Sequence, residues 1–228
     1  MAAAPGEFSF SAPDEDTQYE TGRFMDWFDH YLKDENTETG PEFAYFRNWI
    51  DYEGNAAPAY ATSDTVDVGT ARAFHLSADG GTATGRHAGD TGFEDDRHRT
   101  GWAATGVEPL NINPAGNIPN AQIPGTEALW TTAPMTEAMD VVGAPTVTLR
   151  VAAPGQPVVF AKLYDVAPDG TSSLINGLIA PIRISDPSQP VPVTMPAIVH
   201  RFEPGHSVRL AITGGDISFR GGDCKVCR

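Results

Sequence analysis

Two histidines near a carboxylate have side chains and a spacing that could support acid–base catalysis or metal binding. His200 and His206 flank Glu203 and the pair Pro204-Gly205. Because imidazole changes charge near neutral pH and binds metals, this group could form an acid–base site or supply two metal ligands. The same residues also suit a tight turn leading into a strand, with the imidazoles hydrogen-bonded to backbone groups. We favour this second interpretation.

A second charged segment lies between residues 86 and 99. It holds two histidines and four carboxylates, in Arg86-His87, Asp90 and Glu94-Asp95-Asp96-Arg97-His98-Arg99. Such side chains could bind calcium or a transition metal, but the dedicated D-x-[DN]-x-[DN]-G spacing is missing. The mixed charges favour a solvated loop. Asp165 and Asp169 could also suggest calcium, but aspartate is frequent in turns, and we interpret both as turn formers.

Candidate nucleophiles lack the surroundings that would activate them. A serine nucleophile of the α/β-hydrolase type sits on a sharp turn with the pattern G-x-S-x-G. Gly205-His206-Ser207 keeps only the first glycine and leads into a strand, and Gly170-Thr171-Ser172 fails as well. Cys224 and Cys227 form C-x-x-C, but neither a βαβ unit nor two further metal ligands accompany them. We therefore assign no catalytic, cofactor-binding or metal-binding residues.

The composition is that of an acidic chain with many turns. The 228 residues carry a formal net charge of −15, are 40% hydrophobic, and include 23 glycines and 19 prolines. This is enough apolar content for one β domain with an arm. The negative charge argues against nucleic-acid and anionic-membrane partners, and no apolar run approaches the roughly 18 residues of a membrane span. Residues 1–6 do not resemble a signal peptide, so we expect a cytoplasmic location by default, with a secreted parent protein as the alternative.

Residues 158–166 predict a central strand, and Pro168-Asp169-Gly170 predicts the tight turn after it. One face of this strand presents small and branched apolar side chains, Val159, Ala161 and Leu163, and suits the core of a sandwich. The other face presents Phe160, Lys162 and Tyr164. Because two aromatics are rarely left to water, we expect this face to be covered, by either the 21–33 helix or the 82–127 loop.

Other short strands are predicted near residues 72–76, 128–133, 145–152, 173–186, 190–196 and 207–213. No helical pattern separates the later ones, which favours a sandwich or a jelly roll. Residues 42–52 are expected to be extended. Residues 53–70 and the long segment 82–127, which is low in apolar residues, are expected to be loops.

An amphipathic helix is predicted over residues 21–33, with Thr21 as its N-cap. Five apolar side chains share one face at helical spacing: Phe24, Trp27, Phe28, Tyr31 and Leu32. An isolated helix of this length is marginal in water, so this face must pack on a partner surface. Residues 1–20, rich in proline and acidic residues, predict a loop or a disordered lead.

Three segments carry a family resemblance: FAKLYDVAPDG at 160–170, GLIAPIR at 177–183 and VHRFEPGHSVRL at 199–210. Together they resemble the C-terminal jelly-roll domain of the X-Pro dipeptidyl-peptidase and cocaine-esterase-like serine hydrolases. Residues 24–33 resemble the last helix of the α/β-hydrolase domain in that family. The resemblance implies an all-β fold, a galactose-binding-like jelly-roll β-sandwich with a short N-terminal helical arm. It also implies a division into residues 1–41 and 42–228.

The resemblance further implies a non-catalytic domain that packs on a hydrolase core and shapes its pocket for peptide, ester or amide substrates. No position matches the family's catalytic triad, and the first histidine, His30, lies within the predicted helix. We therefore predict that the chain alone is inactive and needs no cofactor. One alternative is a stand-alone module that binds protein or carbohydrate, with Trp102 or Trp130 stacking on a sugar. Without a hydrolase core, we expect the 21–33 helix to fold back on the sandwich, with self-association as the next alternative.

Overall fold

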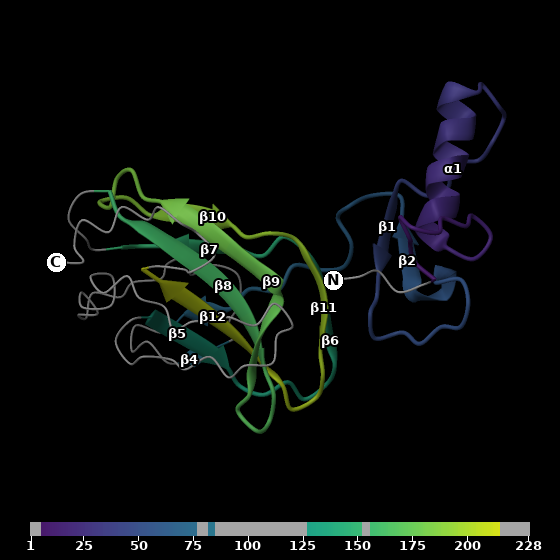
Figure 1. The fold of residues 1–228 in the computed structure, drawn as a ribbon. Coiled ribbons are helices and arrows are strands. Elements are labelled where there is room, and N and C mark those ends of the chain that lie inside the picture. Colours follow the sequence, from purple (N-terminus) through teal and green to yellow (C-terminus); the bar gives the residue numbers. More distant parts are fainter. Residues whose placement is uncertain (1–5, 77–81, 85–126, 152–155, 215–228) are drawn as a thin grey trace. The chain divides into compact units, whose positions relative to one another are not determined.

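The computed structural model describes residues 6–76, 82–84, 127–151 and 156–214 (Figure 1). These described residues are mostly β-strand with one N-terminal helix, and their sheets are antiparallel apart from one parallel pair of strands. It divides into two compact units, Met1–Gly69 and Thr70–Arg228. Among the described residues, no helix is long and apolar enough to cross a membrane.

The first unit contains helix α1 (Tyr19–Leu32), strand β1 (Phe43–Phe46), a 3-10 turn (Ala57–Ala59) and strand β2 (Tyr60–Ser63). β1 and β2 pair antiparallel. The extended segment predicted over 42–52 is confirmed only where β1 forms, since residues 48–50 turn instead. The loop predicted over 53–70 is wrong where β2 forms. Hydrogen bonds from Arg47 explain why this segment is regular although its apolar residues show no strand periodicity. The guanidinium of Arg47 donates to the carbonyls of Pro58, Ala59 and Tyr60.

Helix α1 begins earlier than predicted, and Thr21 is not its N-cap. The N-cap is Gln18, and Thr21 lies buried in the first turn. The side-chain oxygen of Gln18 accepts hydrogen bonds from the Thr21 hydroxyl at 2.7 Å and from the backbone N–H groups of Ser9 and Asp14 at 3.1 and 3.3 Å. Gln18 therefore joins the preceding loop to the helix, and that part of the predicted lead is an ordered loop.

The polar face of α1 is held by the segment that follows the helix. His30 Nδ1 lies 2.9 Å from the carbonyl oxygen of Thr37, and the Arg23 guanidinium donates to the carbonyl of Pro41 at 3.4 Å. A Cβ atom at Gly40, whose φ is +72°, would overlap the Arg23 guanidinium. Glycine is therefore favoured there by the backbone conformation, whereas the flexible Arg23 side chain could shift to make room for a Cβ atom.

The described part of the second unit contains ten strands. They are β3 (His75–Leu76), β4 (Thr82–Thr84), β5 (Glu127–Thr132), β6 (Met139–Gly143), β7 (Thr146–Leu149), β8 (Val158–Val166), β9 (Ser172–Arg183), β10 (Val191–Thr194), β11 (Ile198–Phe202) and β12 (Ser207–Thr213). Six of them form one sheet in the order β3-β4-β5-β12-β8-β9, and β7–β10 and β6–β11 form two-stranded sheets (Figure 1).

Strand β8 confirms the central prediction. It lies between β12 and β9, and is antiparallel to both. The turn after it is also confirmed, since the Gly170 N–H donates to the Ala167 carbonyl at 2.9 Å and Gly170 adopts a φ of +87°. On the second face of β8, Phe160, Lys162 and Tyr164 are 3%, 1% and 2% exposed. The expected cover of this face is confirmed, and the identity of the covering segment stays a prediction.

The main core cluster joins one face of the six-stranded sheet to β7 and β10. Its members include Trp130, Val159, Ala161, Ile182, Leu210 and Ile212 from the large sheet, with Leu149 from β7 and Val193 from β10. A second cluster joins Ile175 of β9 to Ile198 and Phe202 of β11. Asn176 and Gly177 follow Ile175 with positive φ, where β8 and β9 lose regular register, so β9 bulges at this second cluster.

Some predictions are wrong, and others concern residues outside the described ranges. Strands β6 and β11 were not predicted. The predicted 82–127 loop is wrong at its ends, where β4 and the first residue of β5 form. The charged segment 86–99, Trp102, Cys224 and Cys227 lie outside the described residues.

Candidate functional site

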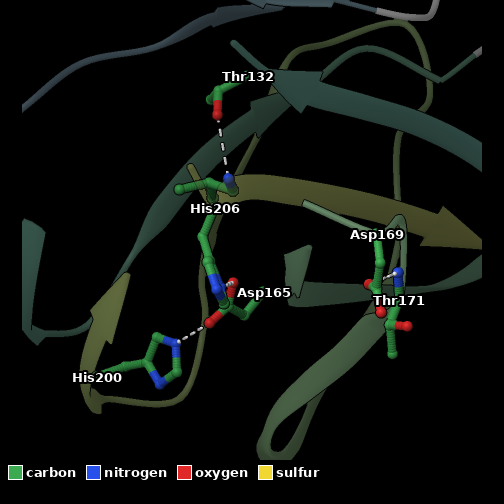
Figure 2. A network of polar contacts seen from close by, with 7 residues as sticks. Thr132, Asp165, Asp169, Thr171, His200 and His206 are labelled. Carbon is green, nitrogen blue, oxygen red and sulfur yellow. Dashed lines mark hydrogen bonds and ion pairs between the residues drawn. The ribbon is translucent and has the colours of Figure 1, made fainter. Parts of the chain in front are cut away.

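Asp165, near the end of β8, joins two histidines from different segments (Figure 2). Its Oδ2 atom lies 2.9 Å from Nε2 of His200 on β11, and its Oδ1 atom lies 2.8 Å from Nδ1 of His206. All three side chains are mostly buried. We call these three residues the Asp165 cluster. It links β8 to β11 and to the turn that precedes β12.

Backbone contacts place His206 near Asp165. In the β8–β12 register, Ser207 pairs with Val166, the last residue of β8, so His206 lies just beyond the end of that strand. The turn that leads to His206 contains Gly205, whose φ is +87°. Two short bonds to Met135 hold this turn: the Gly205 N–H donates to the Met135 carbonyl at 2.8 Å, and the Met135 N–H donates to the His206 carbonyl at 2.7 Å. The histidine is therefore fixed on both its backbone and its side chain.

The electrostatics of the Asp165 cluster favour an ionised carboxylate. Burial raises the pKa of the Asp165 carboxyl, but hydrogen bonds from His200 and His206 and the attraction of their charges lower it by more. The net pKa lies below the ordinary value of 3.8. Because an ionised carboxylate only accepts hydrogen bonds, His200 donates through Nε2 and His206 through Nδ1.

These contacts correct the predicted surroundings of the histidines. The turn into a strand is confirmed, but the imidazoles contact the Asp165 carboxylate rather than backbone groups or Glu203. The exposed Glu203 contributes its backbone oxygen, which accepts from the His206 N–H at 3.0 Å. The interpretation of Asp169 as a turn former is confirmed, since its Oδ1 atom accepts from the Thr171 N–H at 2.8 Å. The same interpretation of Asp165 is wrong.

The chemistry open to the Asp165 cluster is limited by its neighbours. Ser207 follows His206 directly, but it is buried in β12 and cannot meet a substrate. Within the described ranges, no group of three or more His, Cys, Asp or Glu side chains could hold a metal ion. The geometry suits a polar cross-link between strands, in which one charged acceptor satisfies two buried donors.

The suggested sugar-stacking role of Trp130 is wrong. The side chain is fully buried in the main core cluster, between the large sheet and β7 and β10. A tryptophan that stacks on carbohydrate must present a ring face to solvent. Trp102, the other residue suggested for this role, lies outside the described residues.

The other candidate site is a surface on the first unit. Six large apolar side chains of α1 are exposed: Phe24, Met25, Trp27, Phe28, Tyr31 and Leu32. We call them the α1 stripe. The exposed fraction is 47% for Trp27 and 71% for Leu32. The Trp27 ring centroid lies 4.9 Å from that of Tyr31 and 5.4 Å from that of Phe28, so three aromatic rings of the stripe are neighbours. Sequence periodicity predicted five of these residues, and Met25 at the edge of the face was missed.

Comparison with known proteins places this fold in a family. Residues 31–219 match the family described as the X-Pro dipeptidyl-peptidase C-terminal non-catalytic domain. None of the curated proteins matches the chain. Among solved structures, the chain is similar to an aminopeptidase from a marine sediment archaeon, a Thaumarchaeota archaeon. The TM-score is 0.59 at 18% identity, over 85% of this chain and 36% of that one.

A second similar structure is a CocE/NonD family hydrolase from Staphylococcus aureus, with a TM-score of 0.55 at 12% identity over 90% of this chain and 40% of that one. At these identities the likeness is one of fold, and the chain spans less than half the length of either protein. The family match covers most of the chain, including β1 to β12 and the whole Asp165 cluster. The chain therefore belongs to the family of X-Pro dipeptidyl-peptidase C-terminal non-catalytic domains.

Proposed function

We propose that the chain acts as an accessory domain that packs on an α/β-hydrolase catalytic domain and shapes its substrate pocket. The observation that carries this proposal is the α1 stripe. An apolar face on a helix of 14 residues is normally the face that packs against a core. Here His30 and Arg23 on the polar face contact the chain's own backbone, while the apolar face is exposed. The apolar side of the helix is therefore accessible for packing against a partner domain.

The proposed architecture is a galactose-binding-like jelly-roll β-sandwich, residues 42–228, preceded by an acidic lead and helix, residues 1–41. The sandwich is supported by the main core cluster, which lies between the six-stranded sheet and strands β7 and β10. The arm is supported by the resemblance of residues 24–33 to the last helix of a hydrolase domain. In this arrangement α1 is the element that connects the two domains.

The proposed parent reaction is hydrolysis of a peptide, ester or amide bond by a serine nucleophile on the catalytic domain. It is supported by the family match and by the names of the two similar structures, an aminopeptidase and a CocE/NonD family hydrolase. The part of this chain in the reaction is indirect. Its loops would limit which substrates reach the nucleophile, and it would supply no reacting group.

The test begins with the coding region upstream of this sequence. We expect it to encode a hydrolase domain with a G-x-S-x-G nucleophile turn. That domain, produced together with this chain, should hydrolyse an X-Pro nitroanilide or a nitrophenyl ester. Replacing Trp27 and Phe28 by serine should lower both the binding of the domains and kcat/KM, while Val66→Ser, another exposed apolar position, should change neither. Full activity of the hydrolase domain without this chain would contradict the proposal.

A further inference from the structure

The two units differ strongly in charge. Residues 1–69 contain 15 aspartates and glutamates against 3 lysines and arginines, a net charge of −12 with histidine neutral. Residues 70–228 contain 15 acidic against 12 basic residues, a net charge of −3. The unit that presents the α1 stripe therefore carries most of the negative charge of the chain.

The three cations of the first unit are all engaged within it. Arg23 donates to the Pro41 carbonyl, and Lys33 pairs with Asp29 on the same helix. Arg47 donates to three carbonyls around the start of β2. Most of the acidic side chains, in contrast, are exposed, including Asp34 and Glu35 directly after α1. A partner that approaches the stripe therefore meets an apolar centre in a negative field.

The size of the α1 stripe is informative about its partner. An aromatic side chain buries about 150–250 Å² when covered completely, so six half-exposed side chains offer about 500 Å². A stable interface needs about 800 Å² on each side. Two stripes placed face to face would fall short of this area and would bring two units of net charge −12 together. At about 0.01 M salt the screening length is about 30 Å, so this repulsion would act across the whole interface.

We propose that the α1 stripe docks on an apolar surface rimmed by lysine and arginine on another protein domain, and not on a second copy of this chain. This inference rests on the proposed function, in which that domain is the hydrolase catalytic domain. The basic rim adds the attraction that the apolar area alone does not provide, and it selects against self-association.

The first test measures the mass of the full chain by light scattering, at about 20 mM and about 500 mM NaCl, two salts that differ strongly in screening. We expect the mass of one chain, 24.3 kDa, at the lower salt. Any association at the higher salt should disappear in Trp27→Ser/Phe28→Ser. A dimer that is already present at the lower salt and is lost in this variant would overturn the inference, because the stripe would then bind a second copy.

The second test uses two amphipathic helical peptides with the same leucine face, one rimmed by lysine and the other by glutamate. Binding to the full chain is followed by calorimetry. We expect the lysine peptide to bind at least about tenfold more tightly at low salt, and to lose that advantage at 500 mM NaCl. Asp34→Lys/Glu35→Lys should reduce the preference several-fold, and Trp27→Ser/Phe28→Ser should abolish binding. Circular dichroism confirms that each variant keeps α1.

Equal affinity for the two peptides, or lysine-peptide binding that survives Trp27→Ser/Phe28→Ser, would overturn the inference. The outcome is separable from that of the proposed function. A clear preference for the lysine peptide, combined with a hydrolase domain that neither binds this chain nor responds to it, would reject the proposed partner and leave the chemistry of the docking surface in place.

Discussion

Nδ1 of His206 lies 2.8 Å from Oδ1 of Asp165, a residue 41 positions earlier in the chain. This contact fixes the turn before β12 to the end of β8. The second oxygen of the same carboxylate accepts from His200 on β11. Strands of the large sheet and of the β6–β11 sheet are thus connected by one ionised group, and the stability of the second unit should depend on it.

Asp165→Asn should destabilise the chain by about 1–3 kcal/mol, because it removes the charge that two mostly buried donors share. Urea unfolding measures this change. The matched control is Asp140→Asn, which breaks the pair with Arg201 at 2.6 Å on an exposed part of β6 and β11. An exposed pair contributes less than about 1 kcal/mol, so the two variants should differ clearly. Equal losses would show that the Asp165 cluster adds no stability of its own.

The same carboxylate predicts a dependence of stability on pH. The pKa of Asp165 is lowered in the folded chain from 3.8, so folding favours the ionised form. The stabilisation is present above pH 3.8 and is lost as the pH falls through the lower folded pKa. The difference in unfolding free energy between the natural chain and Asp165→Asn should therefore shrink as the pH falls below about 4. A difference that stays constant from neutral to acidic pH would contradict this assignment.

Phe160→Ala should cost about 3 kcal/mol or more, because it removes a large side chain from a closely covered face of β8. Phe160 is only 3% exposed, although it lies on the face of β8 opposite the main core cluster. Val66→Ala, at an exposed position, should change the unfolding free energy by less than about 0.5 kcal/mol. A comparable small loss for Phe160→Ala would mean that its cover contributes little to stability.

Local sequence patterns predicted the elements with clear periodicity. Val159 and Ala161 alternate with Phe160 and Lys162, and β8 has the predicted limits. The apolar spacing of α1 predicted five residues of its apolar stripe, but we expected this face to be packed rather than exposed. Thr21 was misread as an N-cap because a threonine before an apolar run is a common cap signal. The actual N-cap, Gln18, makes no side-chain capping bond to a backbone N–H of the helix and instead accepts from the Thr21 hydroxyl.

Long-range pairing accounts for most of what was missed. β6 and β11 do not alternate cleanly between buried and exposed residues, and their positions follow from pairing with each other. The carboxylate that contacts His200 and His206 likewise could not be predicted from the sequence. Glu203 is near them in sequence, but the β8–β12 register brings Asp165 to His206 instead, and His200 on β11 contacts the same carboxylate. A search for carboxylates at strand ends could have suggested Asp165, but only the fold selects it.

The most direct test of the account is to assay the isolated chain for hydrolysis of a nitrophenyl ester and of an X-Pro nitroanilide. We predict no turnover above the uncatalysed rate. The family is described as non-catalytic, and the sequence contains no G-x-S-x-G pattern that would present a serine nucleophile. Turnover that a serine-directed phosphonate abolishes would contradict the central claim that this domain supports catalysis without performing it.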